Sequence, residues 1–360
     1  MTTTSPRAAE RADFLKSTDW ARAKATPLAG DASTRSYERL VLSGRTALLM
    51  NAPPAAETAS CPPEATPGQR RKLGYNAMAR LAGPNLNAFI AIAAALRGAG
   101  LAAPEIYAAD TTRGFALIED FGDDLFARAV ANGADAERLY AAAVDVLLQL
   151  RAAAPAAPQF PQYTMLAYDR TALEAEIGLV LDWYWPFRKG KAPTVAERAA
   201  FAEAWSGALD SVSEPAAMVL RDFHAENLLW MPQKKGVLRV GLIDFQDGLF
   251  GSPAYDLVSL LEDARRDVDE ALALRMIGRY CADAGRGFDE TAFRRDYAIL
   301  AAQRNAKILG IFARLVKRDG KPKYEGLLPR VEGYFRKDLQ RPELAEVRRF
   351  FRTAFPDLAA

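Results

Sequence analysis

Histidine and cysteine are nearly absent from this chain of 360 residues, which contains one histidine, His224, and two cysteines, Cys61 and Cys281. Zinc sites of the usual kind need several imidazole or thiolate ligands, so the composition argues against one. Any metal would have to be bound through oxygen atoms. The two cysteines lie far apart in the sequence, so no disulfide is required, and we expect a reducing compartment, the cytoplasm.

Long apolar runs and an excess of one charge are also missing. No window approaches the roughly 18–20 uninterrupted apolar residues of a membrane span, and the N-terminal segment lacks the apolar stretch of a secretory signal. With 47 basic and 45 acidic residues the net charge is +2, which suggests no electrostatic footprint for nucleic acid. We expect neither a membrane nor a nucleic acid as a partner, and we expect a monomer.

The sequence changes character near residue 123, which predicts two lobes, since a single core rarely exceeds about 250–300 residues. The first part contains an amphipathic pattern at 11–24, two short β-favouring runs around the turn SGR, and a helical pattern at 85–100. The second part is mainly helical, except that 219–250 predicts two short strands. We expect an α+β fold, with a small antiparallel-sheet lobe (1–119), a hinge (120–123) and a larger helical lobe (124–360).

Carboxylate and amide side chains recur within the exceptional segment. Asp222 and Asn227 have four residues between them in LRDFHAENLLW, and Asp244 ends the apolar run VGLID 17 residues later. In phosphoryl transfer an aspartate can orient or deprotonate the accepting hydroxyl, while asparagine and aspartate oxygens bind Mg²⁺ beside nucleotide phosphates. The alternative is an exposed turn that leads into a strand, because short motifs often match by chance. The position between β-like runs, and a second run ending in aspartate, favour catalysis.

Several stretches resemble a known family. LRDFHAENLLW, LIDFQDGLFGSPAYDL and the strand–hairpin–helix–strand order of the first lobe resemble the aminoglycoside phosphotransferase/choline kinase superfamily, which has a bilobal protein-kinase-like fold. GDASTRSYERL with TALLMNAPP, LIDFQDGLFGSPAYDLVSLLEDAR and QRNAKILGIFARLVKRDGK resemble bacterial anomeric kinases. Those enzymes phosphorylate N-acetylmuramate and N-acetylglucosamine at C1 in the recycling of peptidoglycan sugars.

The resemblance implies ATP and Mg²⁺ as cofactors and assigns roles in the catalytic segment. Asp222 would be the catalytic base, and Asn227 and Asp244 would bind Mg²⁺. Asp256 would brace the catalytic loop through the loop's backbone. His224 would either hydrogen-bond the γ-phosphate or hold the loop's shape.

Two further segments would contact the nucleotide. EDFGD (119–123) would form the hinge against the adenine, with Glu119 and Phe121 as contacts. GDASTRS (30–36) would take the place of the glycine-rich phosphate loop. There, Ser33 and Thr34 offer hydroxyl donors and Arg35 a charge for phosphate.

The chain departs from the superfamily pattern at two places. Leu220-Arg221-Asp222 stands where His-Gly-Asp is usual, and Met50 or Asn51 occupies the expected place of the third-strand lysine. The glutamate partner of that lysine is missing too, because residues 65–104 contain no acidic residue. Another cation must then hold the α- and β-phosphates. The candidates are Arg35, Arg71, Lys72 and Arg80, for each of which a solvated surface charge is the alternative.

The acceptor region is basic. Residues 301–360 carry 14 basic and 7 acidic residues, which favours an anionic acceptor such as the lactyl carboxylate of N-acetylmuramate over cationic aminoglycosides or choline. These charges could instead line outer helix faces. The candidate acceptor-binding residues are Arg304, Asn305, Lys307, the aromatic pair Trp183 and Tyr184, and the glutamates Glu174 and Glu176. A core cluster is the alternative for the aromatic pair, and a solvated helix face for either glutamate.

The sequence therefore predicts an ATP- and Mg²⁺-dependent kinase that phosphorylates the anomeric hydroxyl of an amino sugar. Two alternatives remain. One is a kinase for another small molecule, such as an aminoglycoside or an amino alcohol, and the other is a nucleotide-binding pseudokinase. The presence of Asp222, Asn227 and Asp244 together argues against the pseudokinase, because a binding module needs no base.

Overall fold

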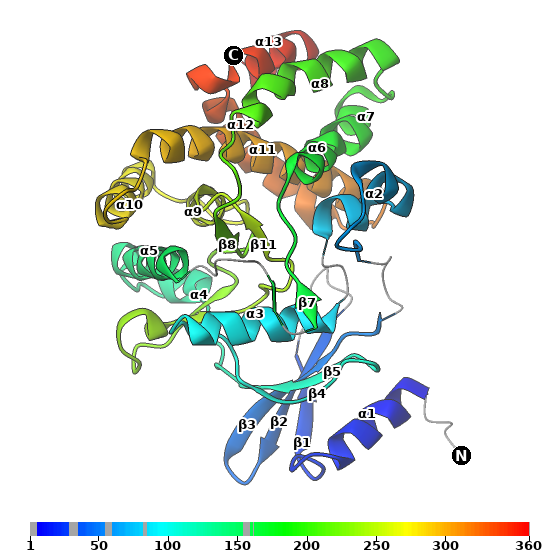
Figure 1. Cartoon of the computed structure of the whole chain (residues 1–360), viewed down its shortest axis with the longest axis vertical. Coiled ribbons are helices and arrows are strands. Elements are labelled where there is room, and N and C mark those ends of the chain that lie inside the picture. The colour runs from blue at the N-terminus through cyan, green and yellow to red at the C-terminus, as the bar shows by residue number, and fades with distance from the viewer. Residues whose placement is uncertain are drawn as a thin grey trace.

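Five antiparallel strands form the small lobe, at the N-terminal end of the chain (Figure 1). The computed structural model describes residues 6–28, 35–54, 60–81, 85–153, 159–160 and 162–359. The strands lie in the order β1-β2-β3-β5-β4. Their bounds are β1 (Lys24–Pro27), β2 (Ser36–Leu42), β3 (Arg45–Asn51), β4 (Ile106–Asp110) and β5 (Phe115–Ile118).

The β2–β3 hairpin forms as its sequence predicts. Ser43 and Gly44 both have positive φ, 51° and 78°, the conformation that matches the twist of a two-residue hairpin. Side chains alternate across the sheet: Leu49 packs with Leu117 on one face, while Met50 belongs to the core of the rest of the molecule. The helix α3 (Leu86–Gly98) lies between the sheet and the larger lobe (Figure 1).

The first helix, α1 (Pro6–Lys16), covers the other face of the sheet, where Phe14 stacks on Phe115 with ring centroids 5.6 Å apart. The predicted helix at 11–24 is therefore wrong in its bounds. The hydroxyls of Ser17 and Thr18 donate to the carbonyls of Phe14 and Leu15 at 2.7 and 2.9 Å. Such local hydrogen bonds compete with helix continuation.

The larger lobe is mainly helical, which confirms the expected α+β architecture. Its central element is α11 (Glu290–Lys317), which packs against α6, α9 and α12. The other helices are α4 (Phe126–Ala131), α5 (Ala136–Ala152), α6 (Arg170–Leu179), α7 (Trp185–Lys189), α8 (Val195–Asp210), α9 (Ala254–Leu261), α10 (Glu270–Asp283), α12 (Leu328–Asp338) and α13 (Ala345–Ala354). Short turns are η3 (Val180–Tyr184), η4 (Gly236–Arg239), η5 (Pro322–Leu327), η6 (Pro342–Leu344) and η7 (Pro356–Leu358).

Four short strands, rather than the two predicted, occupy the segment 217–251. β8 (Ala217–Val219) pairs with β11 (Leu249–Gly251), and β9 (Leu228–Trp230) pairs with β10 (Val240–Leu242), both antiparallel. Each of the two predicted strands is divided into two, because a polar loop begins after only three strand residues. A two-residue pair, β6 (Gln159–Phe160) and β7 (Tyr163–Thr164), lies elsewhere in the lobe.

The segment that follows β3 crosses to the larger lobe. Its helix α2 (Pro67–Leu73) and the π-helical turn η2 (Asn76–Arg80) pack together, and η2 also contacts α6 (Figure 1). Arg70 is buried and donates to Asp169, the N-cap of α6, at 2.5 Å. This ion pair attaches the connection between β3 and α3 to the larger lobe.

Across the described ranges, no helix has both the length and the apolar character needed to cross a membrane.

Candidate active site

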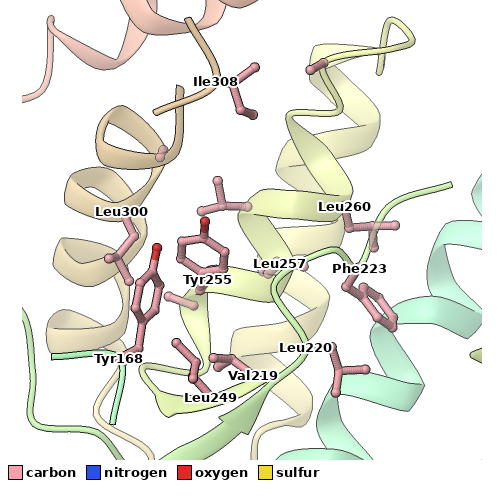
Figure 2. Packing of buried hydrophobic residues seen from close by; sticks show 14 of the residues in the cluster. Tyr168, Val219, Leu220, Phe223, Leu249, Tyr255, Leu257, Leu260, Leu300 and Ile308 are labelled. Carbon is pink, nitrogen blue, oxygen red and sulfur yellow. The ribbon is translucent and has the colours of Figure 1, made fainter. Parts of the chain in front are cut away.

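The loop 220–227 joins β8 to β9, and its apolar residues anchor it to the larger lobe. Leu220, Phe223 and Ala225 are buried, and Figure 2 shows Leu220 and Phe223 within the packed core that also contains Leu260 of α9. Asp222 lies between these anchors and stays half-buried. Because the anchors alternate with polar residues, the core holds the loop while the carboxylate of Asp222 remains available.

Asp256, at the start of α9, braces the same loop through the loop's backbone. Its carboxylate accepts hydrogen bonds from the backbone N–H groups of Leu220 and Arg221, at 2.6 and 2.8 Å. Burial raises the pKa of Asp256 to about 7, against the opposing effect of these two donors. The expected brace through the loop's backbone is confirmed.

The structure brings Asp222, Asn227 and Asp244 together. The amide nitrogen of Asn227 donates to the carbonyl of Asp222 at 3.0 Å and lies 3.5 Å from Oδ2 of Asp244. Asp244 follows β10 in a left-handed conformation, φ 58°, and its Oδ1 accepts from Gln246 at 2.8 Å. Among the described residues, no donor engages the amide oxygen of Asn227, which leaves it available as a ligand.

The two carboxylates have opposite pKa shifts. Burial opposes ionisation of Asp222, but the positive charges of Lys307 and Arg221 outweigh it and lower the pKa. For Asp244, desolvation and the negative charge of Asp222 raise the pKa, although its side chain is 46% exposed. Asp222 is therefore ionised at neutral pH, and a cation beside Asp244 would relieve the repulsion between them.

No group of three or more His, Cys, Asp or Glu side chains within the described residues could hold a metal ion. The pair formed by Asn227 and Asp244 is smaller than such a group and consists of oxygen donors. Mg²⁺ is commonly held by one or two protein groups, with water and phosphate oxygens completing its shell. The donors present fit that chemistry.

The side chain of His224, within the loop 220–227, is buried. Its Nε2 lies 3.2 Å from a guanidinium nitrogen of Arg265 and 3.4 Å from the amide nitrogen of Asn227. A guanidinium only donates, so Nε2 accepts and the ring proton resides on Nδ1. Burial and the charge of Arg265 lower the pKa of His224 to about 4, which keeps the ring neutral.

A buried charge cluster that the sequence did not reveal lies beneath Asp222. The carboxylate of Glu176, in α6, is fully buried and binds the guanidinium of Arg221, the ammonium of Lys307 at 2.8 Å, the hydroxyl of Tyr168 and the amide of Gln303 at 3.0 Å. Burial opposes ionisation of Glu176, but Lys307 and Arg221 outweigh it and lower its pKa. The signal for this cluster in the sequence was Leu220-Arg221-Asp222, which departs from the usual His-Gly-Asp of the superfamily.

The segment 120–123, expected to form the hinge, is attached to the small lobe by Arg39, which sequence reasoning missed. This residue of β2 donates to Asp120 at 2.7 Å and to Asp123 at 2.8 Å. The candidate contacts lie beside these aspartates. Glu119 accepts from the backbone of Glu105 at 3.2 Å. A Cβ at Gly241 would come within 2.9 Å of the Phe121 ring, so only glycine fits beneath that ring.

The candidate phosphate-binding residues are only partly described. Ser33 and Thr34 lie outside the described residues. Arg35 has a guanidinium nitrogen 3.7 Å from Oδ1 of Asp244, which places it beside the proposed metal ligands. Arg80, from η2, forms an ion pair with Asp247 at 3.1 Å.

Two other residues, Arg71 and Lys72, were candidates to replace the missing lysine, and Met50 and Asn51 are the positions expected for it. None of the four shows a contact with Asp222, Asn227 or Asp244 among the described residues. Arg71 and Lys72 are exposed on α2. Met50 is buried. The side-chain oxygen of Asn51 accepts from Arg7 at 2.9 Å.

Most of the candidate acceptor residues are engaged within the protein. Arg304 donates to the carbonyl of Glu262 and the hydroxyl of Ser259, and Asn305 donates to Glu262 and Asp338. Both side chains are buried. Lys307 is paired with Glu176 at 2.8 Å, and its charge, like that of Arg304, lowers the pKa of Asp222.

The aromatic pair and Glu174 also have partners within the lobe. Tyr184 is fully buried against Phe355 and its hydroxyl donates to Glu332 at 2.6 Å. Trp183 is half-buried beneath the guanidinium of Arg318. Glu174 is exposed and pairs with Arg170 one helical turn away.

Comparison with known proteins decides the family. Residues 24–294 match the model of the phosphotransferase enzyme family. The chain belongs to this family. It is 43% identical to an N-acetylmuramate/N-acetylglucosamine kinase from Caulobacter vibrioides, over 98% of this chain and 97% of that protein. It is 31% identical to a protein of the same name from Pseudomonas putida, over 93% and 90% of the two chains.

The structure agrees at the level of the fold. The structure of a microcompartment-associated aminopropanol kinase aligns with a TM-score of 0.58 and 13% identity, over 93% of this chain and 98% of that one. The two-lobe, protein-kinase-like architecture of this phosphotransferase is thus confirmed.

A cavity of about 980 Å³ lies between α8 and α13. In Figure 1 this pair of helices lies at the end of the larger lobe farthest from the sheet. None of the candidate site residues of this phosphotransferase lines this cavity.

Proposed function

We propose that this phosphotransferase transfers the γ-phosphoryl group of ATP to the anomeric C1 hydroxyl of N-acetylmuramate and N-acetylglucosamine, in the recycling of peptidoglycan sugars. The observation that carries the proposal is 43% identity over 98% of the chain to a kinase named for these two sugars. The convergence of Asp222, Asn227 and Asp244 supports the chemistry.

Asp222 would accept the hydrogen bond of the anomeric hydroxyl and orient its oxygen toward the phosphorus atom. That hydroxyl is more acidic than an ordinary alcohol, so positioning contributes more than deprotonation. The lowered pKa of Asp222 keeps it an acceptor at neutral pH. Its brace, Asp256, and the ion pair of Arg221 with Glu176 would hold the loop in register.

Asn227 and Asp244 would hold Mg²⁺ through their side-chain oxygens. When bound, the ion would neutralise charge on the β- and γ-phosphates. Arg35, 3.7 Å from Asp244, would supply a second positive charge at the phosphates in place of the absent lysine. Ser33 and Thr34 would add hydroxyl donors, while Glu119 and Phe121 would border the adenine.

We further propose that residues 1–119 act as the nucleotide-binding lobe, that 120–123 act as the hinge and that 124–360 carry the catalytic and acceptor-binding groups. Arg39 would couple the first lobe to the hinge through Asp120 and Asp123. The enzyme would work as a monomer in the cytoplasm.

Coupled measurement of ADP release would test the proposal, with N-acetylmuramate, N-acetylglucosamine, kanamycin and choline as acceptors. We expect turnover with the two sugars, and a product whose phosphorus couples to the anomeric proton in NMR spectra. Turnover with kanamycin or choline alone would show a kinase for another small molecule. ADP release with none of them would favour a nucleotide-binding pseudokinase, which the missing third-strand lysine makes the second candidate.

A further inference from the structure

Arg314 lies on the face of α11 that is directed toward the catalytic loop. Gln303 and Lys307 of this helix both reach Glu176, at 3.0 and 2.8 Å. Residues spaced by seven share a helix face, so Arg314 lies two turns beyond Lys307 on the same stripe. The rise of about 1.5 Å per residue separates the two Cα atoms by about 10 Å.

The guanidinium of Arg314 has no anionic partner among the described residues. Its Nε atom is buried without a hydrogen-bond partner, and no carboxylate of the described residues lies within ion-pair distance of the side chain. The ring of Tyr75, 5.7 Å from the guanidinium carbon, is its described neighbour. Burial lowers the pKa of Arg314, and the positive charges of Arg318 and Arg80 act in the same direction. A half-buried cation is costly without a counter-ion.

Tyr75 connects Arg314 to the catalytic loop. Its pKa is raised, first by burial and then by the negative charge of Glu176, while the positive charges of Arg221 and Arg314 act against the shift. The hydroxyl therefore lies within electrostatic range of both the Glu176–Arg221 pair and Arg314. Within the described part of the chain it makes no hydrogen bond, so it is available to a ligand.

The other basic candidates near the site already have partners. Arg304 is bound to Glu262 and Ser259, Lys307 to Glu176, and Arg80 to Asp247. An anionic group on the acceptor would gain little from displacing these contacts. Arg314 is the guanidinium that such a group would complete.

We propose that Arg314, assisted by the hydroxyl of Tyr75, forms a subsite for a carboxylate on the acceptor sugar. This inference rests on the proposed function. With its anomeric hydroxyl at Asp222, the lactyl arm of N-acetylmuramate would extend one ring's width along α11. N-acetylglucosamine lacks the carboxylate, so Arg314 would determine the preference between the two sugars.

The test is the variant Arg314→Met, with kcat and KM measured for both sugars and for ATP. Removal of one partner of a charge-assisted pair should lower kcat/KM for N-acetylmuramate roughly 30-fold or more, mainly through KM. The value for N-acetylglucosamine should stay within about twofold, since neutral contacts are unaffected. Arg314→Lys should lower kcat/KM for N-acetylmuramate by an intermediate factor, because lysine keeps the positive charge but cannot bind a carboxylate through two parallel N–H groups.

A matched control is Arg294→Met, near the N-terminal end of α11, where the guanidinium is exposed and pairs with Glu290 at 2.7 Å. It should change neither sugar's kcat/KM by more than about twofold. The methyl ester of N-acetylmuramate gives a test that needs no variant. With the wild-type protein, kcat/KM for the ester should be lower than for the free acid by the same factor that Arg314→Met produces. With Arg314→Met, the ester and the free acid should have the same kcat/KM.

An equal loss for both sugars, or a change confined to the KM for ATP, would overturn the carboxylate subsite. An ester that wild-type protein uses as well as the free acid would also overturn it, even if the variant did not fold. Failure of the proposed function looks different, because wild-type protein would then release ADP with neither sugar.

Discussion

Arg221 and Asp244 adopt left-handed backbone conformations, with φ of 69° and 58°, at the two loops that form the site. Such conformations are uncommon for residues with a Cβ and cost free energy, on the order of 1 kcal/mol or more. At Arg221 the surroundings offset this cost. Its N–H binds Asp256, its carbonyl accepts from Ser259 at 3.0 Å, and its guanidinium binds Glu176.

Asp222→Asn should remove turnover while nucleotide binding persists. The amide keeps the side chain's shape but loses the negative charge that orients the hydroxyl and accepts its proton, so we expect kcat to fall about 10²–10⁴-fold. The Kd for ATP should change little, because Asn227 and Asp244 are untouched. Asp145→Asn, an exposed residue of α5, is the control. Near-normal kcat in Asp222→Asn would show that another group is the base.

His224→Ala should affect stability more than chemistry. The neutral, buried ring contacts Arg265 and Asn227, so its loss leaves a cavity, and we expect unfolding to become easier by about 1–3 kcal/mol. Turnover should fall less than tenfold, because Asp222 keeps its brace. Calorimetry and steady-state kinetics measure the two effects. A large loss of kcat at unchanged melting temperature would instead place His224 at the γ-phosphate.

At the scale of elements, Glu176 joins α6, α11 and the catalytic loop through one carboxylate. Arg221 comes from the loop, and Lys307 and Gln303 come from α11. Ser259 of α9 adds a second link, because it binds the carbonyl of Arg221 and is itself bound by Arg304. The basic residues expected at the acceptor therefore include two that position the loop instead.

Glu176→Gln should destabilise the protein strongly. The amide leaves two buried cations without a counter-charge, and breaking a buried pair typically costs about 3–5 kcal/mol. Denaturant unfolding would measure the change. Glu174→Gln, two residues earlier on the same helix and exposed, should stay within about 0.5 kcal/mol. Equal effects of the two substitutions would show that the buried cluster does not support the loop.

At the scale of the whole molecule, residues 60–81 tie the connection after β3 to the larger lobe. Arg70 binds Asp169 and the carbonyls of Ala77 and Met78, the last at 2.7 Å. Any motion of the small lobe relative to the larger one would therefore have to occur around this attachment as well as at the proposed hinge.

Global stability should depend on pH through a buried carboxyl pair. Glu262 and Asp338 both receive hydrogen bonds from Asn305, and burial raises the pKa of each; for Asp338 the charge of Glu262 adds to the shift. The folded state therefore holds a proton that the unfolded state has released above about pH 4. This contribution is complete below that pH and is lost as pH rises through the folded pKa. Asp256, with its pKa of about 7, acts in the same direction.

We expect the free energy of unfolding to fall between about pH 5 and 8, by at most about 1.4 kcal/mol per pH unit for each proton involved. Asp338→Asn should make this slope smaller, and Asp319→Asn, at the exposed end of α11, should not. His224 has the opposite sign, since its lowered pKa costs stability below about pH 6.5. Identical pH slopes in wild type and Asp338→Asn would refute the role of the pair.

Much of this protein could be predicted from local sequence, because local chemistry determines it. The β2–β3 hairpin follows from the turn residues between two apolar runs, and α3 from its periodicity. The order Asp222, Asn227, Asp244 predicted that these side chains come together, and they do, because the start of β9 and the end of β10 lie at the same end of an antiparallel pair. The brace by Asp256 was predicted from the family resemblance rather than from local chemistry.

Only the tertiary structure decided which charges are paired. Arg304, Lys307 and Arg314 look alike in sequence, yet the first two bind buried partners and the third does not. Likewise Tyr184 packs into the core, and Glu176 rather than Glu174 reaches the catalytic loop. Helical spacing specifies which residues share a face. The elements packed against that face determine whether a charge meets solvent, a counter-charge or a ligand, and these elements come from distant parts of the chain.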